Sequence, residues 1–118
     1  MLTLWQFIRD YGCQRLSHLY IIDQSPKLVT DAEWPCGIYG DFDATRSQRL
    51  IAEMRHDFAE AVMRLEAYGL NARVRNGYER NSVAWQKLRL YLRSLKPGPL
   101  IALCELLVAT DLRDVLPK

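Results

Sequence analysis

Residues 43–69 read DATRSQRLIAEMRHDFAEAVMRLEAYG, and this stretch decides the fold class. Apolar side chains recur in it at alternating steps of three and four, which is the spacing of one face of an α-helix. They are Ile51, Met54, Phe58, Ala61, Leu65 and Tyr68. We therefore predict one long helix over residues 44–68, roughly 40 Å in length at about 1.5 Å per residue. In a chain of 118 residues, such a rod is expected to be the central element.

Both ends of this predicted helix carry the residues that commonly end helices. Asp43 is a candidate N-cap, and Gly69 can adopt the left-handed conformation that closes a helix. We expect the side opposite the apolar stripe to face water and to hold an ion pair between Glu60 and Arg64, worth about 0.2–0.5 kcal/mol. This polar side carries Glu53, His56, Glu60 and Met63.

One amphipathic helix is predicted before the rod in the sequence, and another is predicted after it. The first begins at about Leu4, because Leu4, Trp5, Phe7, Ile8 and Tyr11 follow at helical intervals. The second begins after Asn81 or Ser82, either of which can cap it, and runs to Leu95. Its inner stripe is predicted to consist of Ala84, Trp85, Leu88, Tyr91, Leu92 and Leu95.

A further helix is predicted to begin at Pro99, since proline is well suited to the first position of a helix. Residues 100–109 are apolar on all sides of this helix apart from Glu105. A helix without a polar face needs burial on more than one side. It is therefore either the central helix of a bundle or part of an interface with a second copy or a partner, and the sequence favours neither.

The segment between the rod and the second amphipathic helix is predicted to turn back on itself. Asn76-Gly77 is flanked by Arg73-Val74-Arg75 and Tyr78-Glu79-Arg80, and an Asn-Gly pair is a strong signal for a tight hairpin turn. We therefore predict a small β-hairpin near residues 73–80.

Together these elements predict an all-α fold in which four to five helices form one bundle-like domain over residues 1–118. A composition that is 49% hydrophobic supplies enough material for such a core. The alternative is an α+β fold, in which Leu19–Ile22, Gly37–Phe42 and the hairpin form a minor sheet.

The cysteines and the hydropathy of the chain indicate the cellular compartment in which the protein is expected. Cys13, Cys36 and Cys104 are odd in number and far apart, which indicates neither a disulfide framework nor a cysteine zinc site. The longest apolar run, residues 100–109, is half of the ~20 residues that a membrane span needs, and no secretory signal is visible. We expect a soluble cytoplasmic protein without a membrane partner.

Charge is distributed unevenly along the chain. Residues 73–96 carry a net charge of +6, whereas the whole chain carries +2. Such a basic segment can bind phosphate groups, so nucleic-acid binding is the second hypothesis for function. The residues of this basic face are Arg73, Arg75, Arg80, Arg89, Arg93 and Lys96.

The leading hypothesis comes from the outward side of the predicted helix that ends at Leu95. Val83 and Leu90 lie there at positions where polar residues are usual, and Gln86 and Arg93 flank them. Apolar residues framed by arginine are typical of protein interfaces. We therefore expect a non-catalytic interaction module, a small regulator or inhibitor that docks on a partner protein and occludes it, acting as a homodimer.

An enzyme or metal protein is the third hypothesis. Glu53 and His56 have the Glu-x-x-His spacing of di-iron bundles, but those sites need the pair twice. His18 is the other histidine, and no phosphate-binding loop, nucleophile elbow or zinc-protease motif is present. We predict no catalytic residue, metal ligand or cofactor.

Overall fold

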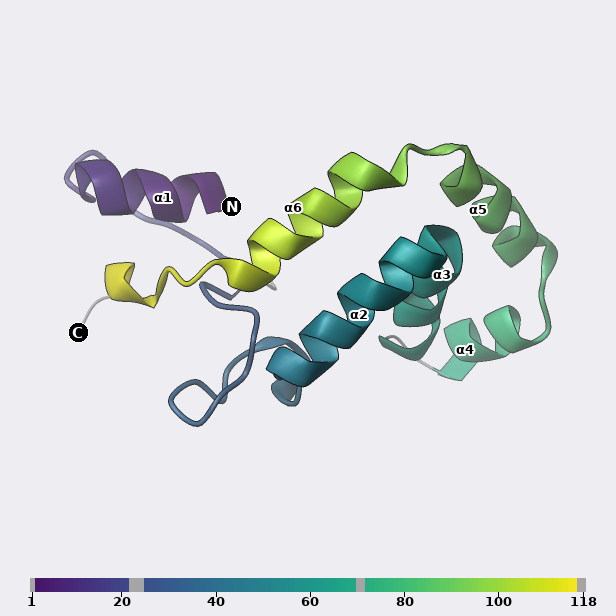
Figure 1. Ribbon diagram of the computed structural model, residues 1–118. Coiled ribbons are helices and arrows are strands. Elements are labelled where there is room, and N and C mark those ends of the chain that lie inside the picture. The colour runs from purple at the N-terminus through teal and green to yellow at the C-terminus, as the bar shows by residue number, and fades with distance from the viewer. Residues whose placement is uncertain (1, 22–24, 70–71, 117–118) are drawn as a thin grey trace. The chain divides into compact units, whose positions relative to one another are not determined.

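All regular secondary structure in the described part of the chain is helical. The computed structural model describes residues 2–21, 25–69 and 72–116, and within them it contains six α-helices, two 3₁₀ helices and no β-strand (Figure 1). The predicted all-α class is confirmed. The segments of the alternative minor sheet form no strand in the described residues, and Ile22 of that alternative lies outside them. Two isolated β-bridges occur elsewhere, between Lys27 and Asp111 and between Asp31 and Trp34. The elements are α1 (Leu2–Tyr11), η1 (Ile38–Gly40), α2 (Ala44–His56), α3 (Phe58–Gly69), α4 (Ala72–Glu79), α5 (Val83–Ser94), α6 (Pro97–Ala109) and η2 (Arg113–Val115).

Two groups of residues are each held together by their own contacts. Unit 1 comprises residues 1–47 and 106–118, and unit 2 comprises residues 48–105. In unit 2, α5 packs against α3 and α4, while in unit 1 α1 packs against η2. The organisation of residues 1–118 as a single bundle-like domain stays a prediction.

The predicted rod over residues 44–68 is two helices. It begins as expected, because Asp43 Oδ1 accepts a hydrogen bond of 2.8 Å from the backbone N–H of Arg46. At Asp57 a second N-cap interrupts it, where Oδ1 accepts a bond of 3.1 Å from the backbone N–H of Glu60. The chain turns there between α2 and α3 (Figure 1). Aspartate favours a cap over a helix interior, so the Asp57-x-x-Glu60 spacing was the signal that the prediction missed.

The predicted hairpin near residues 73–80 is wrong, because this segment is the helix α4. The left-handed residue is Asn81, with φ of 48°, rather than Gly77. The backbone N–H of Ser82 bonds to Gly77 O at 3.0 Å and that of Asn81 to Tyr78 O at 2.8 Å. This pair of bonds is a Schellman motif, which ends α4 and directs the chain into α5.

The core of unit 2 is centred on α3. Met63 is fully buried, with 0% of its surface exposed, although the sequence placed it on the polar side. Ala59 and Leu92 are buried against it, so the inner face of α3 faces the inner face of α5. Half-buried side chains complete this cluster: Phe58, Val62, Tyr78, Trp85, Leu88 and Leu95.

Gly77 allows α4 and α5 to approach closely. A Cβ atom at this position would lie 2.9 Å from Nε1 of Trp85, which is closer than such atoms normally come. The Trp85 ring meets the Tyr78 ring edge to face, with centroids 5.3 Å apart. Gly77 therefore serves packing between two helices rather than the turn that the sequence predicted.

The apolar helix α6 is not buried on all sides. It begins at Pro97, two residues before the predicted start. Leu100 and Leu103 are exposed, whereas Ile101 and Cys104 are half-buried. Glu105 is the one charged residue of this helix. Within unit 2 it accepts a hydrogen bond of 2.5 Å from Arg55 Nη2, so its charge is paired. No helix in the described part of the chain is long and apolar enough to cross a membrane.

Unit 1 is organised around the connection between α1 and α2. Phe42 of this connection and Leu112 of the C-terminal segment are buried in unit 1. The connection is ordered by backbone hydrogen bonds from Thr30 N to Phe42 O at 2.8 Å and from Ile38 N to Leu28 O at 2.9 Å. The C-terminal segment joins it through a bond of 3.0 Å from Leu112 N to Pro26 O. In its described residues, 12–21 and 25–43, the long connection is therefore folded without strands or long helices.

Candidate functional site

The outward side of α5 carries the predicted partner-binding residues. Val83 is 65% exposed and Leu90 is 71% exposed, and they lie two turns apart on the same side of the helix. Gln86 is exposed beside them, and its Nε2 donates a hydrogen bond of 2.8 Å to Asn81 O. Arg93 lies on the same flank, with its Nη2 3.8 Å from Asp57 Oδ2. The structure thus places all four residues on one exposed surface.

This surface extends further than the sequence indicated. Tyr91 and Ala84 were assigned to the inner stripe, but Tyr91 is 61% exposed and Ala84 is exposed as well. The stripe is narrower than predicted because α5 packs against α3 and α4 from one side only. We call the exposed side the α5 outer face; it consists of Val83, Ala84, Gln86, Lys87, Leu90, Tyr91 and Arg93.

The opposite side of α5 holds this face in place. Arg89 Nε donates a bond of 3.1 Å to Glu60 Oε2, and Arg89 Nη1 donates one of 2.7 Å to Asn81 Oδ1. The Tyr78 hydroxyl donates to the other oxygen of Glu60. This bond lowers the pKa of Glu60 and raises the pKa of Tyr78. A charged and hydrogen-bonded Glu60 therefore links α3 with α4 and α5, in place of the predicted pair with Arg64.

The predicted basic face is partly neutralised. Arg89 is paired with Glu60 and Arg93 lies near Asp57, so at least two of the six cations face a carboxylate of their own chain. The guanidinium of Arg75 lies over the Tyr68 ring, 5.1 Å from its centroid. Arg73, Arg80 and Lys96 are exposed. The surface available to phosphate groups is therefore less basic than the sequence suggests.

Two of the residues considered for metal binding, Glu53 and His56, lie together in unit 2. His56 lines an open hollow of about 600 Å³ in unit 2, together with Arg49, Glu53, Glu60 and Arg64 among others. Among the described residues, no three His, Cys, Asp or Glu side chains are placed to hold a metal ion. Burial raises the pKa of the Cys104 thiol, which disfavours the reactive thiolate at that residue.

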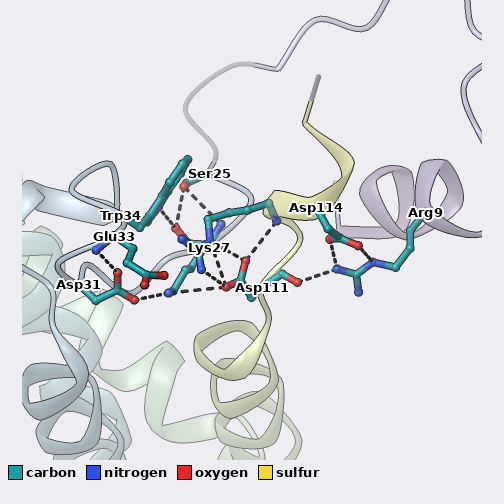
Figure 2. A network of polar contacts seen from close by, with 9 residues as sticks. Arg9, Ser25, Lys27, Asp31, Glu33, Trp34, Asp111 and Asp114 are labelled. Atoms are coloured by element: carbon teal, nitrogen blue, oxygen red, sulfur yellow. Dashed lines mark hydrogen bonds and ion pairs between the residues drawn. The ribbon is translucent and has the colours of Figure 1, made fainter. Parts of the chain in front are cut away.

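Unit 1 contains a network of charged residues that the sequence did not predict (Figure 2). Arg113 binds the Asp111 carboxylate through Nε at 2.9 Å and through Nη2 at 2.7 Å. Lys27 Nζ lies 3.6 Å from Asp111 Oδ2 and also pairs with Asp31. From α1, Arg9 pairs with Asp114. The C-terminal segment is thus attached both to α1 and to the connection that follows it.

The same network is anchored on Trp34. The Arg113 guanidinium lies 5.7 Å from the centroid of the Trp34 ring, and Trp34 Nε1 donates a bond of 3.0 Å to Lys27 O. Ser25 Oγ donates to the same carbonyl at 2.7 Å. These contacts place the network between segments that are far apart in the sequence, which is why no local motif could reveal it.

Unit 1 is expected to lose stability in acid. The hydrogen bond from Arg113 lowers the pKa of Asp111 from 3.8 to about 2, and that from Arg9 lowers the pKa of Asp114. The folded state therefore binds these protons more weakly than the unfolded chain, so this stability is present above about pH 4 and is lost toward pH 2. Unfolding by urea at pH 6 and at pH 3, followed by tryptophan fluorescence, should show the loss.

The variant Asp111→Asn should show a smaller difference in stability between pH 6 and pH 3. Glu66→Gln is the matched control, because Glu66 is exposed and belongs to unit 2. An unchanged pH dependence in Asp111→Asn would contradict the role given to this carboxylate.

No protein-family model, no curated protein and no solved structure matches the chain.

Proposed function

We propose that the protein is a non-catalytic interaction module, a small regulator or inhibitor that docks on a partner protein through the α5 outer face. The observation that carries the proposal is the high exposure of Val83 and Leu90 on a helix whose other side is packed in a core. Burying a leucine or valine side chain contributes about 1.5–3 kcal/mol. A face that leaves two such side chains in water can therefore gain free energy by burying them against a partner.

Occlusion is the mode of action that fits this surface best. The outer face is a convex helix surface, and Tyr91 adds an aromatic side chain of the kind that contributes most to interfaces. Bound to a partner, such a helix covers a part of the partner's surface. No side chain with catalytic chemistry is needed for this effect.

Leu90→Ser is expected to weaken binding to the partner about fivefold or more, because a central apolar contact in an interface is worth more than about 1 kcal/mol. The fold should be unchanged, since substitutions at exposed positions alter stability by about 0.5 kcal/mol or less. A photo-crosslinking amino acid at Gln86 identifies the partner in cells, and calorimetry with the purified pair then measures the dissociation constants.

Two controls make this experiment specific. The first is Leu19→Ser, which removes an exposed leucine from unit 1 instead of from α5 and should leave binding unchanged. The second is the same crosslinker at Glu66, an exposed position on α3. Equal crosslinking at Gln86 and Glu66, or equal binding by wild type and Leu90→Ser, would overturn the proposal.

Homodimer formation is part of the proposal and is tested separately. Leu100 and Leu103 are exposed on α6, whose one charged residue, Glu105, is paired with Arg55, so they suit contact with a second copy better than the outer face of α5 does. Light scattering of wild type and Leu103→Ser measures the mass. A monomeric wild type would remove the dimer from the proposal and leave the docking surface in place.

A further inference from the structure

The α5 outer face lies in a part of the chain that contains cations and no acids. Residues 80–104 include five Lys and Arg residues and neither Asp nor Glu. Two of the five, Arg89 and Arg93, face carboxylates of α3 or of the α2–α3 junction. In the part of the chain that the structure describes, the other three form no ion pair; they are Arg80, Lys87 and Lys96.

Lys87 occupies the middle of this face. It lies one turn after Val83 and one turn before Leu90, and so between the two most exposed apolar side chains of this helix. Arg80 precedes the helix and Lys96 follows it. The face therefore combines two apolar side chains about 10.5 Å apart along the helix axis with the unpaired charge of Lys87 between them. Arg80 and Lys96 add one positive charge before the helix and one after it.

Three classes of occupant are considered for this face: a second copy of the chain, a nucleic acid and a segment of another protein. The arrangement disfavours the first two. Across a two-fold axis, the centre of a face meets the same residues of the second copy, so Lys87 would lie close to Lys87 of the other chain. A nucleic acid would use the cations but would leave Val83, Leu90 and Tyr91 without apolar burial. A protein segment with apolar and acidic residues satisfies both parts of the surface.

We propose that the docking segment of the partner is an acidic amphipathic helix that packs along α5. Two apolar residues of that helix, seven positions apart, contact Val83 and Leu90, and carboxylates beside them pair with Lys87 and with the cation at either end. This inference rests on the proposed function and adds the chemistry of the partner to it.

Three synthetic helical peptides test the inference with the full-length protein. They share leucines at positions i, i+3 and i+7 and differ only in their flanking residues, which are glutamate, lysine or glutamine. Fluorescence anisotropy should show the glutamate peptide binding at least tenfold more tightly than the lysine peptide. High salt should reduce this difference, because it screens charges at the surface.

Charge reversal supplies the decisive comparison. Lys87→Glu should reverse the order of the glutamate and lysine peptides, and Lys87→Gln should remove most of the preference without reversing it. Arg15→Glu changes the net charge of the chain by the same amount at an exposed position in unit 1, so it should leave the order unchanged. Circular dichroism confirms that each variant is folded before binding is compared.

The outcomes separate this inference from the function on which it rests. If the glutamate and lysine peptides bind equally and Leu90→Ser weakens both, the acidic partner is wrong but the docking surface stands. If none of the peptides binds, the inference is overturned, while crosslinking at Gln86 still tests the docking surface. Tighter binding to a labelled DNA duplex than to the glutamate peptide also overturns it and favours nucleic acid.

Discussion

Met63→Ala is expected to lower the free energy of unfolding by about 2–5 kcal/mol, the usual cost of truncating a large buried side chain. Met63 is fully buried and packs with Ala59 and Leu92, so the small neighbours on α3 cannot fill the space that alanine leaves. Urea unfolding followed by circular dichroism at 222 nm measures the change. A domain of this size is stable by only about 5–15 kcal/mol, so the effect is large.

The control for this experiment is Leu90→Ala, which truncates a side chain of similar size on the exposed face of α5. It should change stability by about 0.5 kcal/mol or less. The same small change at Met63 would mean that this residue faces water, as the sequence predicted. The experiment thus distinguishes the predicted orientation of the helix from the observed one.

Gly37→Ala is expected to destabilise unit 1 by about 1–3 kcal/mol, the typical cost of overpacking a filled site. A Cβ atom at Gly37 would lie 2.5 Å from Leu28 O and 2.7 Å from Thr30 N. These backbone atoms cannot simply rotate away, since Leu28 O accepts the bond from Ile38 N and Thr30 N donates to Phe42 O. Chemical denaturation followed by tryptophan fluorescence, to which Trp34 of unit 1 contributes, reports the loss.

Gly37 is a clean test of close packing because its φ of −67° suits any residue. The cost of alanine is therefore steric and does not come from a left-handed backbone. Gly98→Ala is the matched control, since a Cβ atom there meets nothing within 4 Å and the residue lies in the first turn of α6. Gly98→Ala should be neutral or stabilising by up to about 1 kcal/mol. Equal effects at the two glycines would contradict the packing of this connection.

Helix type and location could be predicted where periodicity and caps agree. The helices that begin near Leu4, after Ser82 and near Pro99 are all present, and Asp43 caps α2 as expected. These features depend on residues that are neighbours along the chain, so local spacing is enough to reveal them. The exposure of Val83 and Leu90 was predictable for the same reason, because it follows from the helical positions of the core residues Trp85, Leu88 and Leu92.

The predictions of the hairpin and of the single rod were wrong because each local sequence signal is compatible with two different structures. Asn76-Gly77 is a strong hairpin signal, yet the chain forms α4 there, because Gly77 lets the helix approach Trp85 and Asn81 supplies the left-handed residue. The rod over residues 44–68 kept a helical period across Asp57, which caps α3 instead of continuing α2. In each case contacts between helices outweigh a preference of a few residues.

The sequence by itself determined that the chain is helical, that one helix presents apolar residues beside cations, and that its charge is uneven. Only the tertiary structure decided which charges remain unpaired. Glu60 and Asp57 approach Arg89 and Arg93 but leave Lys87 without a partner among the described residues. Ion pairs between distant segments follow from packing rather than spacing, and the network around Asp111 in unit 1 has the same origin.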